Sequence, residues 1–339
     1  MSEAIFKLGT FARSGEKPFV GLVMDGRVID LATAHDAFGD SAMGPRDLLA
    51  STATVLDLLE DWDRNFAVLR ALAGFIAADG IASDRFKSSV FGAAGVRVLP
   101  PILRPSKILN TAANYSGHLA EMRDSEYAFG GGVIDKAKHY SGDKTKAQPY
   151  LFLKAPSALA GAFDDIVSPA GDHHLDWEVE IALAIGKPGR RIRADAAHGH
   201  IAGYMTSNDL SCRTMLWRDD RPNFKSDWLS SKSHDTFAPM GPFLVPRAFV
   251  PDSGAVALEL KVNGEIKQKG IAGEMIFSPE EQIEYASRNM TLQSGDIIST
   301  GTIAGVGQGT NTFLKVGDIV EAEAIGLGKQ RNRVIADVP

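Results

Sequence analysis

Two residues capable of acid–base chemistry, His118 and Glu121, lie three positions apart in residues 114–122, NYSGHLAEM. If this segment is helical, the spacing puts both side chains on one face, where a carboxylate can hold an imidazole. An imidazole held in this way is suited to act as a general base. The same spacing also fits a surface helix with an incidental ion pair, so the interpretation depends on the rest of the chain.

A pair of carboxylates occurs in residues 176–186, DWEVEIALAIG. Because strand side chains alternate between two faces, Glu178 and Glu180 point the same way, about 6 to 7 Å apart at their backbones. The same face continues with Ala182 and Ala184, and the opposite face carries Trp177, Val179, Ile181, Leu183 and Ile185. The alanines favour a covered face, although a solvated face would tolerate the two charges at little cost.

A covered pair of carboxylates needs a compensating positive charge, because burying unpaired ions is costly. A hard divalent cation such as magnesium meets this need with two or three carboxylate ligands and several waters. Asp209, in the polar cluster MTSNDLSCR, is the third candidate ligand. Glu178, Glu180 and Asp209 are therefore candidate ligands for such a cation, and a solvated face stays the alternative at this point.

The elements that must position these residues are mainly strands. Residues 19–31, FVGLVMDGRVIDL, are two apolar runs joined by Asp25-Gly26, and residues 256–268, VALELKVNGEIKQ, alternate before Asn263-Gly264. Both residue pairs favour tight hairpin turns. Gly-Asp pairs at 295–296 and 317–318 each precede a further apolar run and predict a turn that starts a strand. The pattern predicts an α+β fold, predominantly β, with antiparallel or mixed sheets and peripheral helices rather than a doubly wound sheet.

A different organisation is expected near the N-terminus. The apolar spacing over residues 45–78 predicts a pair of helices, the second with Asp63 as its N-cap. Pro100, Pro101 and Pro105 follow, and proline cannot donate to a sheet ladder. We therefore expect a small N-terminal α+β domain over residues 1–100 and a catalytic domain over residues 101–339.

Composition narrows the classes of function. The chain has 339 residues, 44% hydrophobic and 23% charged, which is typical of a globular protein with a sizeable core. Its net charge of −6, with scattered basic residues, argues against nucleic-acid binding. We expect a cytoplasmic protein, because no apolar run has membrane-spanning length and the N-terminus does not resemble a signal peptide. The single cysteine, Cys212, excludes an internal disulfide and a thiolate zinc cluster.

Other site motifs are weaker. The run GVGQG at 305–309 lacks the glycine that a dinucleotide fingerprint needs at position 310, where Thr310 stands. The histidines of HGH at 198–200 and of His173-His174 are interpreted as surface or turn residues, since no zinc-ligand spacing accompanies them. Cys212 would need a nearby histidine to be a nucleophile, and no Gly-x-Ser-x-Gly elbow is present.

Taken together, the motifs resemble the C-terminal catalytic domain of the fumarylacetoacetate hydrolase superfamily over roughly residues 105–330. In chain order they are NYSGHLAE, FLKAPSALAG, DWEVEIALAIG, GYMTSNDLSCR, SKSHDTFAPMGP, VNGEIKQ, LQSGDIISTGTIAGVG and LKVGDIVEAEAIGLG. The resemblance implies a mixed β-roll fold and a homodimer. It also implies a magnesium or manganese ion held by Glu178, Glu180 and Asp209.

The resemblance further assigns roles to single side chains. It implies that His118 and Glu121 form a water-activating dyad, on a segment that can close over the metal. Lys154 is expected to stabilise charge near the reacting oxygens, the alternative being a solvated lysine at a strand end. Three further residues match positions that line the metal pocket or contact the substrate in relatives: Lys232, Thr302 and Arg213.

The activity implied is hydrolysis of a carbon–carbon bond in a 1,3-diketo acid, such as an acylpyruvate or a fumarylacetoacetate-like compound from the breakdown of aromatic or sugar acids. The cation would hold the charge that develops as the bond breaks, and His118 would take a proton from the attacking water. Decarboxylation, hydration, lyase chemistry or isomerisation of a 2-oxo acid could use the same site. An inactive metal-binding dimer is the alternative from a different class.

Two departures from the family pattern bear on the substrate. Arg213 follows Asp209 by four residues, as in the hydrolase that names the family, but the glutamine three residues further on there is Leu216 here. The segment 123–149 is also longer than compact members need, with three consecutive glycines and four lysines. It is interpreted either as a solvated loop or as part of a mobile lid over 114–149, with Lys136, Lys138 or His139 facing an anionic group.

Overall fold

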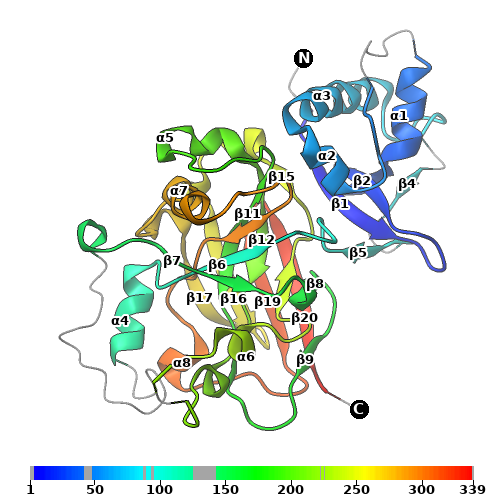
Figure 1. Ribbon diagram of the computed structural model, residues 1–339. Helices are drawn as coiled ribbons and strands as arrows, with labels where there is room; N and C mark the ends of the chain where they lie inside the picture. The colour runs from blue at the N-terminus through cyan, green and yellow to red at the C-terminus, as the bar shows by residue number, and fades with distance from the viewer. Residues whose placement is uncertain are drawn as a thin grey trace.

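The computed structural model describes residues 4–41, 48–86, 89–92, 95–124, 143–221, 223–224 and 226–337. A small α+β domain at the N-terminus sits at one end of a larger, mostly β catalytic domain (Figure 1). The predicted fold class, α+β and predominantly β, is confirmed. The boundary near residue 100 stays a prediction, although the last strand of the first sheet ends at Leu99.

The N-terminal domain is built on a five-stranded sheet in the order β4-β3-β2-β1-β5. The strands are β1 Lys7–Ala12, β2 Phe19–Met24, β3 Arg27–Asp30, β4 Val90–Phe91 and β5 Arg97–Leu99. Asp25 and Gly26 have φ angles of 47° and 72°, as the predicted tight turn between β2 and β3 requires. The hairpin predicted from the Asp25-Gly26 pair is therefore confirmed.

Three helices accompany this sheet: α1 Leu31–Gly39, α2 Val55–Glu60 and α3 Trp62–Asp79. The predicted helical pair corresponds to α2 and α3, whereas α1 was not predicted and residues 45–47 lie outside the described ranges. The prediction that Asp63 caps α3 is wrong, because Asp61 is the N-cap and Asp63 lies in the first turn. The buried Trp62 stacks on Phe66, so the helix begins ahead of Asp63.

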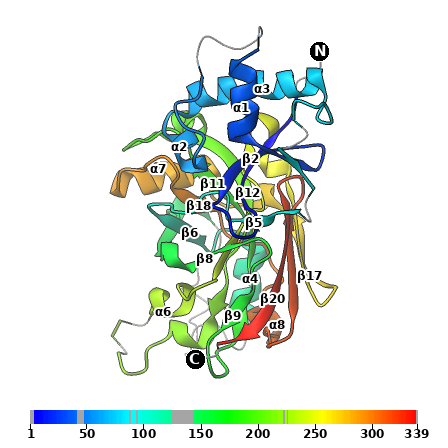
Figure 2. The ribbon, with the colours of Figure 1, turned by 90° about the vertical axis from the view of Figure 1, so that its right-hand side faces the viewer.

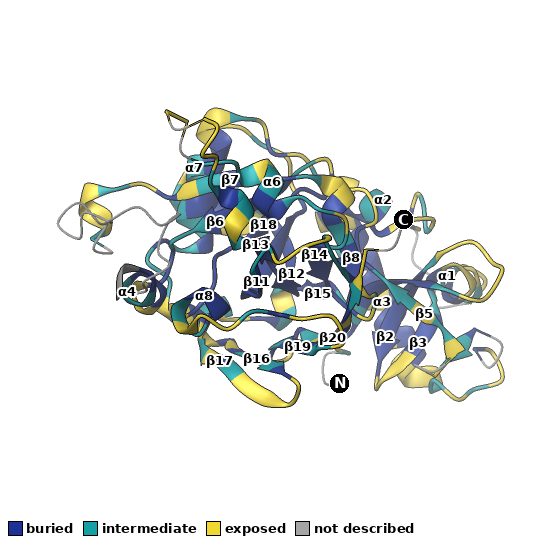
Figure 3. Cartoon of the chain, turned by 90° about the horizontal axis from the view of Figure 1, so that it is seen from below, coloured by how far each residue is buried: buried dark blue, intermediate teal, exposed yellow. Residues whose placement is uncertain are grey.

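An eight-stranded mixed sheet forms the centre of the catalytic domain, in the order β7-β6-β18-β11-β12-β14-β8, with β15 paired to β12. Its strands are β6 Ile108–Ala112, β7 Tyr150–Lys154, β8 Leu159–Gly161, β11 Val179–Ile185, β12 Ile201–Asn208, β14 Ala238–Met240, β15 Val245–Pro246 and β18 Ile297–Ser299. The pairs β6–β18 and β8–β14 are parallel, and the others are antiparallel. All residues of β11 and β12 are buried (Figure 3).

A second sheet of five strands has the order β17-β16-β19-β20-β9. It comprises β9 Ile166–Ser168, β16 Ala257–Val262, β17 Glu265–Ile271, β19 Ile319–Ala324 and β20 Gly328–Ala336, and a separate short pair joins β10 Leu175–Asp176 to β13 Ser211–Cys212. The Asn263-Gly264 hairpin is confirmed, with φ angles of 51° and 84°. Gln330 on β20 donates to the backbone oxygen of Thr206 on β12 at 2.9 Å, so the two sheets are joined by hydrogen bonds as well as by packing.

The helices of the catalytic domain are α4 Ser116–Asp124, α5 Ala194–Ala197, α6 Trp228–Lys232, α7 Pro279–Asn289 and α8 Gly307–Thr310. Single 3-10 turns span Lys144–Lys146, Pro156–Ala158, His198–His200, Arg213–Leu216, Arg247–Phe249, Ser253–Ala255 and Ala272–Glu274. In two perpendicular views, α4, α6 and α8 lie at the end of the catalytic domain that is remote from the N-terminal domain (Figures 1 and 2). His118 and Glu121 lie on α4 and Lys232 lies on α6, so these candidate residues come from helices at this end.

Part of the predicted lid over 114–149 cannot be compared with the structure. Residues 125–142, with Lys136, Lys138 and His139, lie outside the described ranges, so the lid and its basic residues stay a prediction. Within the described ranges, every helix is too short or too polar to cross a membrane. The cytoplasmic location also stays a prediction.

Candidate active site

The structure brings the three predicted carboxylates together. Glu178 directly precedes β11, Glu180 lies on it, and Asp209 directly follows β12. The backbone N–H of Asp209 donates to the backbone oxygen of Glu178 at 2.9 Å, which places the two side chains side by side. One oxygen from each of the three carboxylates lies within 4.8 Å of the others, and all three residues are buried. The expected covering of this face is therefore confirmed.

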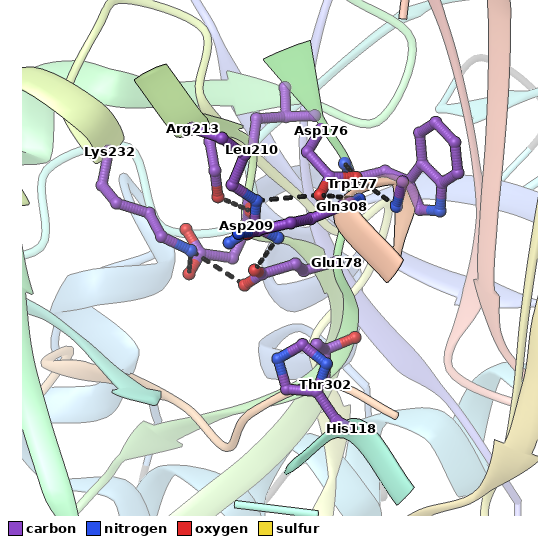
Figure 4. Close-up of polar contacts among 12 residues, drawn as sticks. His118, Asp176, Trp177, Glu178, Asp209, Leu210, Arg213, Lys232, Thr302 and Gln308 are labelled. Carbon is purple, nitrogen blue, oxygen red and sulfur yellow. Dashed lines mark hydrogen bonds and ion pairs between the residues drawn. The ribbon is translucent and has the colours of Figure 1, made fainter. Parts of the chain in front are cut away.

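Basic side chains compensate most of this buried negative charge. The ammonium of Lys232 lies 2.8 Å from Glu178 Oε2 and 2.7 Å from Asp209 Oδ2, so it joins the two carboxylates (Figure 4). Arg213 Nη2 donates to Glu178 Oε1 at 2.6 Å. Burial alone would raise the pKa of Glu178, but the charges of Lys232 and Arg213 outweigh it and hold this pKa below its ordinary value.

Glu180 lacks such compensation. Its Oε2 accepts the N–H of Gly301 at 2.8 Å, but its Oε1 is buried without a hydrogen-bond partner among the described residues. Burial, together with the negative charges of Asp209 and Glu178, raises the pKa of Glu180 well above its ordinary value. A divalent cation fits this position, because three clustered carboxylate oxygens are the ligands that hard cations prefer and one of them lacks a partner.

The predicted pairing of His118 with Glu121 is present on α4. His118 Nδ1 lies 3.5 Å from Glu121 Oε2, and the imidazole lines the same cavity as Glu178 and Asp209. In the view of Figure 4, Glu178 lies between His118 and the basic side chains of Lys232 and Arg213. The ring of His118 is therefore placed to exchange a proton with a molecule bound at the carboxylates.

Asn114, in the same motif, anchors the chain just before α4. Its side-chain nitrogen donates to the oxygens of Phe277 and Thr300 at 3.0 and 2.7 Å, and its Oδ1 accepts the N–H of Phe277 at 2.8 Å. The side chain is buried, so each of these groups is satisfied away from water. Asn114 thus fixes the entrance to the helix that carries His118.

The structure buries Lys154 against Asp209. Its side chain is fully buried, and its ammonium donates to Asp209 Oδ1 and to the oxygens of Leu210 and Phe237, the last two at 3.1 and 2.5 Å. It does not line the cavity, and its burial excludes the solvated alternative. Stabilisation of charge near the reacting oxygens stays a prediction, because the ammonium is engaged with these three acceptors, one of which is a candidate metal ligand. Lys154 holds Asp209 in place.

The three residues predicted to contact substrate, Lys232, Thr302 and Arg213, all line the cavity. Thr302 Oγ1 donates to the oxygen of Val179 and accepts from Gln268 Nε2, both at 2.9 Å, so its hydroxyl is already engaged. Arg213 and Lys232 are engaged with the acidic cluster. A role for any of the three in binding substrate stays a proposal.

Sequence reasoning missed Asp176 as a site residue. Its carboxylate is buried and accepts the backbone N–H of Trp177 at 2.8 Å, of Gly307 at 2.6 Å and of Gln308 at 3.0 Å. It also accepts Arg213 Nε at 2.8 Å. Asp176 therefore orients the guanidinium that in turn holds Glu178, and Gln308, also missed, lines the cavity beside it.

The GVGQG run, excluded above as a nucleotide loop, donates backbone N–H groups to the carboxylates of Glu121 and Asp176. The N–H of Gly305 donates to Glu121, and the N–H of Gly307 donates to Asp176. A β-carbon at Gly309 would clash with the Glu121 carboxylate. The alternating glycines were a visible signal that backbone approaches closely here, but sequence alone does not show which side chains it approaches.

The cavity between these elements has a volume of about 290 Å³. Its polar lining includes His118, Glu178, Asp209, Arg213, Lys232 and Thr302, and its apolar lining includes Leu119, Met122, Tyr150, Phe152, Leu216, Trp217 and Trp228. A group of three or more candidate ligands that could hold a metal occurs, within the described residues, only at the carboxylates. Cys212 is buried, which raises the pKa of its thiol to about 12, so it is not a reactive nucleophile.

Comparison with known proteins identifies the family. The family profile described as "Fumarylacetoacetate (FAA) hydrolase C-terminal" matches residues 107–335. The chain belongs to the fumarylacetoacetate hydrolase family. Within this family, it is 36% identical over 242 residues to the mitochondrial oxaloacetate tautomerase FAHD2A of Bos taurus, covering 71% of this chain and 70% of the relative.

Longer matches within the family cover both domains. The chain is 32% identical over 321 residues to the oxaloacetate tautomerase YisK of Bacillus subtilis (strain 168), covering 93% of this chain and 96% of the relative. A fumarylacetoacetate hydrolase from psychrophilic Exiguobacterium antarcticum is a solved structure with 27% identity and a TM-score of 0.69, covering 98% of this chain and 100% of that one. Family membership supports an enzyme acting on small organic acids, and the carboxylate cluster suits a divalent metal.

Proposed function

We propose that this protein is a divalent-metal-dependent tautomerase that moves a proton between the carbon and oxygen of a 2-oxo acid, interconverting its keto and enol forms. One observation carries the proposal: a general base, His118, held by Glu121, lines the same cavity as a carboxylate cluster that fits a divalent cation. Two of the relatives described above, both named as oxaloacetate tautomerases, support it. Hydrolysis of a carbon–carbon bond, which the family resemblance led us to expect, is therefore the second candidate.

The proposed chemistry divides between the cation and the chain. A magnesium or manganese ion bound by Glu178, Glu180 and Asp209 would supply the positive charge that stabilises a developing oxyanion. With Nδ1 of His118 facing Glu121, Nε2 is the nitrogen that removes the proton from the carbon next to the carbonyl. Glu121 stabilises the imidazolium that forms. His118 then gives the proton to the enolate oxygen, which completes the enol and returns His118 to its neutral form.

Hydrolysis of a carbon–carbon bond in a 1,3-diketo acid is the second candidate. It is favoured by the presence of a carboxylate partner for His118, since the same base can remove a proton from water, and by the likeness to the Exiguobacterium hydrolase. In that reaction hydroxide attacks the distal carbonyl, and the carbon between the two carbonyls leaves as an enolate that is later protonated. Decarboxylation, hydration and lyase chemistry would use the same residues and are distinguished by their products.

The assay uses purified protein with Mg²⁺ or Mn²⁺, oxaloacetate, phenylpyruvate and a panel of acylpyruvates. Enol absorbance and proton NMR are followed together, with EDTA as the control. Faster relaxation of the enol band with all substrate conserved supports the tautomerase. Appearance of pyruvate and a carboxylic acid supports the hydrolase instead. No acceleration of any of these reactions over the EDTA control would overturn both, and would favour the inactive metal-binding dimer.

We also propose a homodimer, as the resemblance implies, and retain the expectation of small-molecule substrates. Light scattering of the protein eluting from a sizing column measures the mass directly. A mass near that of one 36.3 kDa chain would contradict the homodimer.

A further inference from the structure

An aromatic wall borders the carboxylate cluster. Phe152 on β7 and Trp228 on α6 are stacked, with ring centroids 4.6 Å apart and planes at 28°. The ring of Tyr150 lies 5.7 Å from that of Trp228, and all three side chains line the cavity. The ammonium of Lys232, which contacts two of the three carboxylates, lies 5.4 Å from the centroid of Phe152. The aromatic wall therefore begins directly beside the candidate metal site.

Aliphatic side chains extend the apolar lining. Leu119 and Met122 come from α4, the helix of His118, and Leu216 comes from the 3-10 turn that starts at Arg213. Each is at most 7% exposed, although each lines the cavity. A molecule bound at the carboxylates thus meets aromatic and aliphatic surface on its far side. Burial of an apolar group against this surface is favourable, whereas burial of an uncompensated charge is costly.

The basic residues of the described cavity lining are already engaged. Arg213 pairs with Asp176 and Glu178, Lys232 pairs with Glu178 and Asp209, and His118 faces Glu121. Two of the lining hydroxyls are also used, since Thr111 donates to Gln282 and Ser231 donates to the oxygen of Cys212. Within the described lining, a second carboxylate at the far end of a substrate therefore finds no basic side chain without an acidic partner.

We infer that the substrate is a 2-oxo acid whose far end carries an uncharged aromatic group, as in an arylpyruvate or an aroylpyruvate. The inference rests on the proposed function, since it assumes that the 2-oxo acid end binds at the carboxylates. The far ring packs against Phe152 and Trp228, and Leu216 belongs to the same apolar lining. Oxaloacetate, which carries a carboxylate at each end, is a poorer fit to this cavity.

The test compares two dead-end ligands that share a head and differ in the tail. N-phenyloxamate and N-oxalylglycine both carry an oxalyl group whose carbonyl is followed by an amide nitrogen, so neither has a C–H next to that carbonyl. The first has a phenyl tail and the second a carboxymethyl tail. Binding of each to the full chain in Mg²⁺ is measured by titration calorimetry. We expect N-phenyloxamate to bind about tenfold more tightly or better. Equal or tighter binding of N-oxalylglycine, or no binding of N-phenyloxamate, would overturn the inference.

A variant pair locates the preference in the cavity. Leu216→Gln places an amide in the apolar lining and is expected to weaken N-phenyloxamate binding about fivefold or more. Leu229→Gln makes the same change on α6 at a side chain that is 70% exposed and does not line the cavity, so binding should be unchanged. Equal effects of the two changes would count against the inference. Melting curves of both variants check that they are folded.

Turnover then separates this inference from the proposed function. A preference for N-phenyloxamate without acceleration of any keto–enol conversion would leave the inference standing and sink the tautomerase. The opposite result is acceleration with a higher kcat/KM for oxaloacetate than for phenylpyruvate, together with tighter binding of N-oxalylglycine. It would support the tautomerase and overturn the inference. Acceleration that favours phenylpyruvate, with the matching ligand preference, supports both.

Discussion

Both carboxylate oxygens of Glu121 accept the backbone N–H of Gly305, at 3.1 and 3.0 Å. This contact ties α4 to the loop after β18, although the two residues are 184 positions apart. Because the carboxylate is fixed by backbone rather than by a mobile side chain, it offers His118 a partner in one place. The orientation of His118 therefore depends on the loop that contains Gly305.

Gly309→Ala should disturb this arrangement, because the added β-carbon would clash with the Glu121 carboxylate. We expect kcat to fall about tenfold or more, as small misplacements of catalytic groups are costly, with Mg²⁺ binding unchanged. Gly199→Ala is the control, since a β-carbon there meets nothing within 4 Å. Steady-state kinetics and metal titration on both variants decide the matter, and an unaltered kcat in Gly309→Ala would contradict the role given to Glu121.

His118→Gln removes the base and keeps a side chain of similar size. The rate should fall by about 10² to 10⁴, the usual contribution of general base catalysis. Binding of N-phenyloxamate with Mg²⁺ should persist, because His118 is not one of the proposed metal ligands. His198→Gln, at an exposed histidine outside the cavity, serves as the matched change. Full activity in His118→Gln would require another base.

Glu180→Gln should have opposite effects on metal binding and on the metal-free protein. Loss of one ligand oxygen should weaken Mg²⁺ or Mn²⁺ binding at least about tenfold. Without metal, the pKa of Glu180 in the folded protein is raised above its pKa in the unfolded chain. As the pH rises above the pKa of the unfolded chain, ionisation of Glu180 therefore favours unfolding. The neutral amide avoids this loss and should keep or raise the Tm at pH 7. Glu265→Gln, at an exposed residue, is the control. Unchanged metal affinity in Glu180→Gln would exclude it as a ligand.

Cys212 offers a clean test of burial, because it is the chain's single cysteine. Its pKa is raised from 9.0 to about 12, so stability from the neutral thiol is complete below about pH 9 and is lost as the pH rises toward 12. We expect no reaction with a thiol reagent at pH 8 in the native protein and one equivalent in guanidinium chloride. Rapid labelling of the native protein would show that this region opens.

The sequence predicted those features whose causes are local. Asp25-Gly26 and Asn263-Gly264 specify hairpins through their own backbone preferences, and the alternation along β11 put Glu178 and Glu180 on one covered face. Asp209, His118 and Glu121 were candidates from the sequence, and the family resemblance assigned their roles. In contrast, Asp176 could not be assigned, because the partners that reveal its role are backbone N–H groups 131 and 132 residues away.

Lys154 is a second residue whose surroundings depend on parts of the chain distant in sequence. A lysine at the end of a strand is equally compatible with solvent, substrate or a buried ion pair until the chain around residues 209–210 and 237 is placed beside it. The capping error at Asp63 has a tertiary origin too, since packing of Trp62 extended α3. Long-range packing, rather than propensity, decided each of these cases.

The parallel pairing of β6 with β18 has a consequence for how the protein acquires its site. Ile108 pairs with Ile297, and the segment after β18 supplies the N–H groups that hold Glu180 and Glu121. A chain emerging from the ribosome therefore carries all three carboxylates well before it can complete their surroundings. High contact order of this kind slows folding, because a long loop must close before the contacts form. Metal binding should accordingly be among the last events of folding, and its appearance would report that β6 and β18 have paired in the eight-stranded sheet.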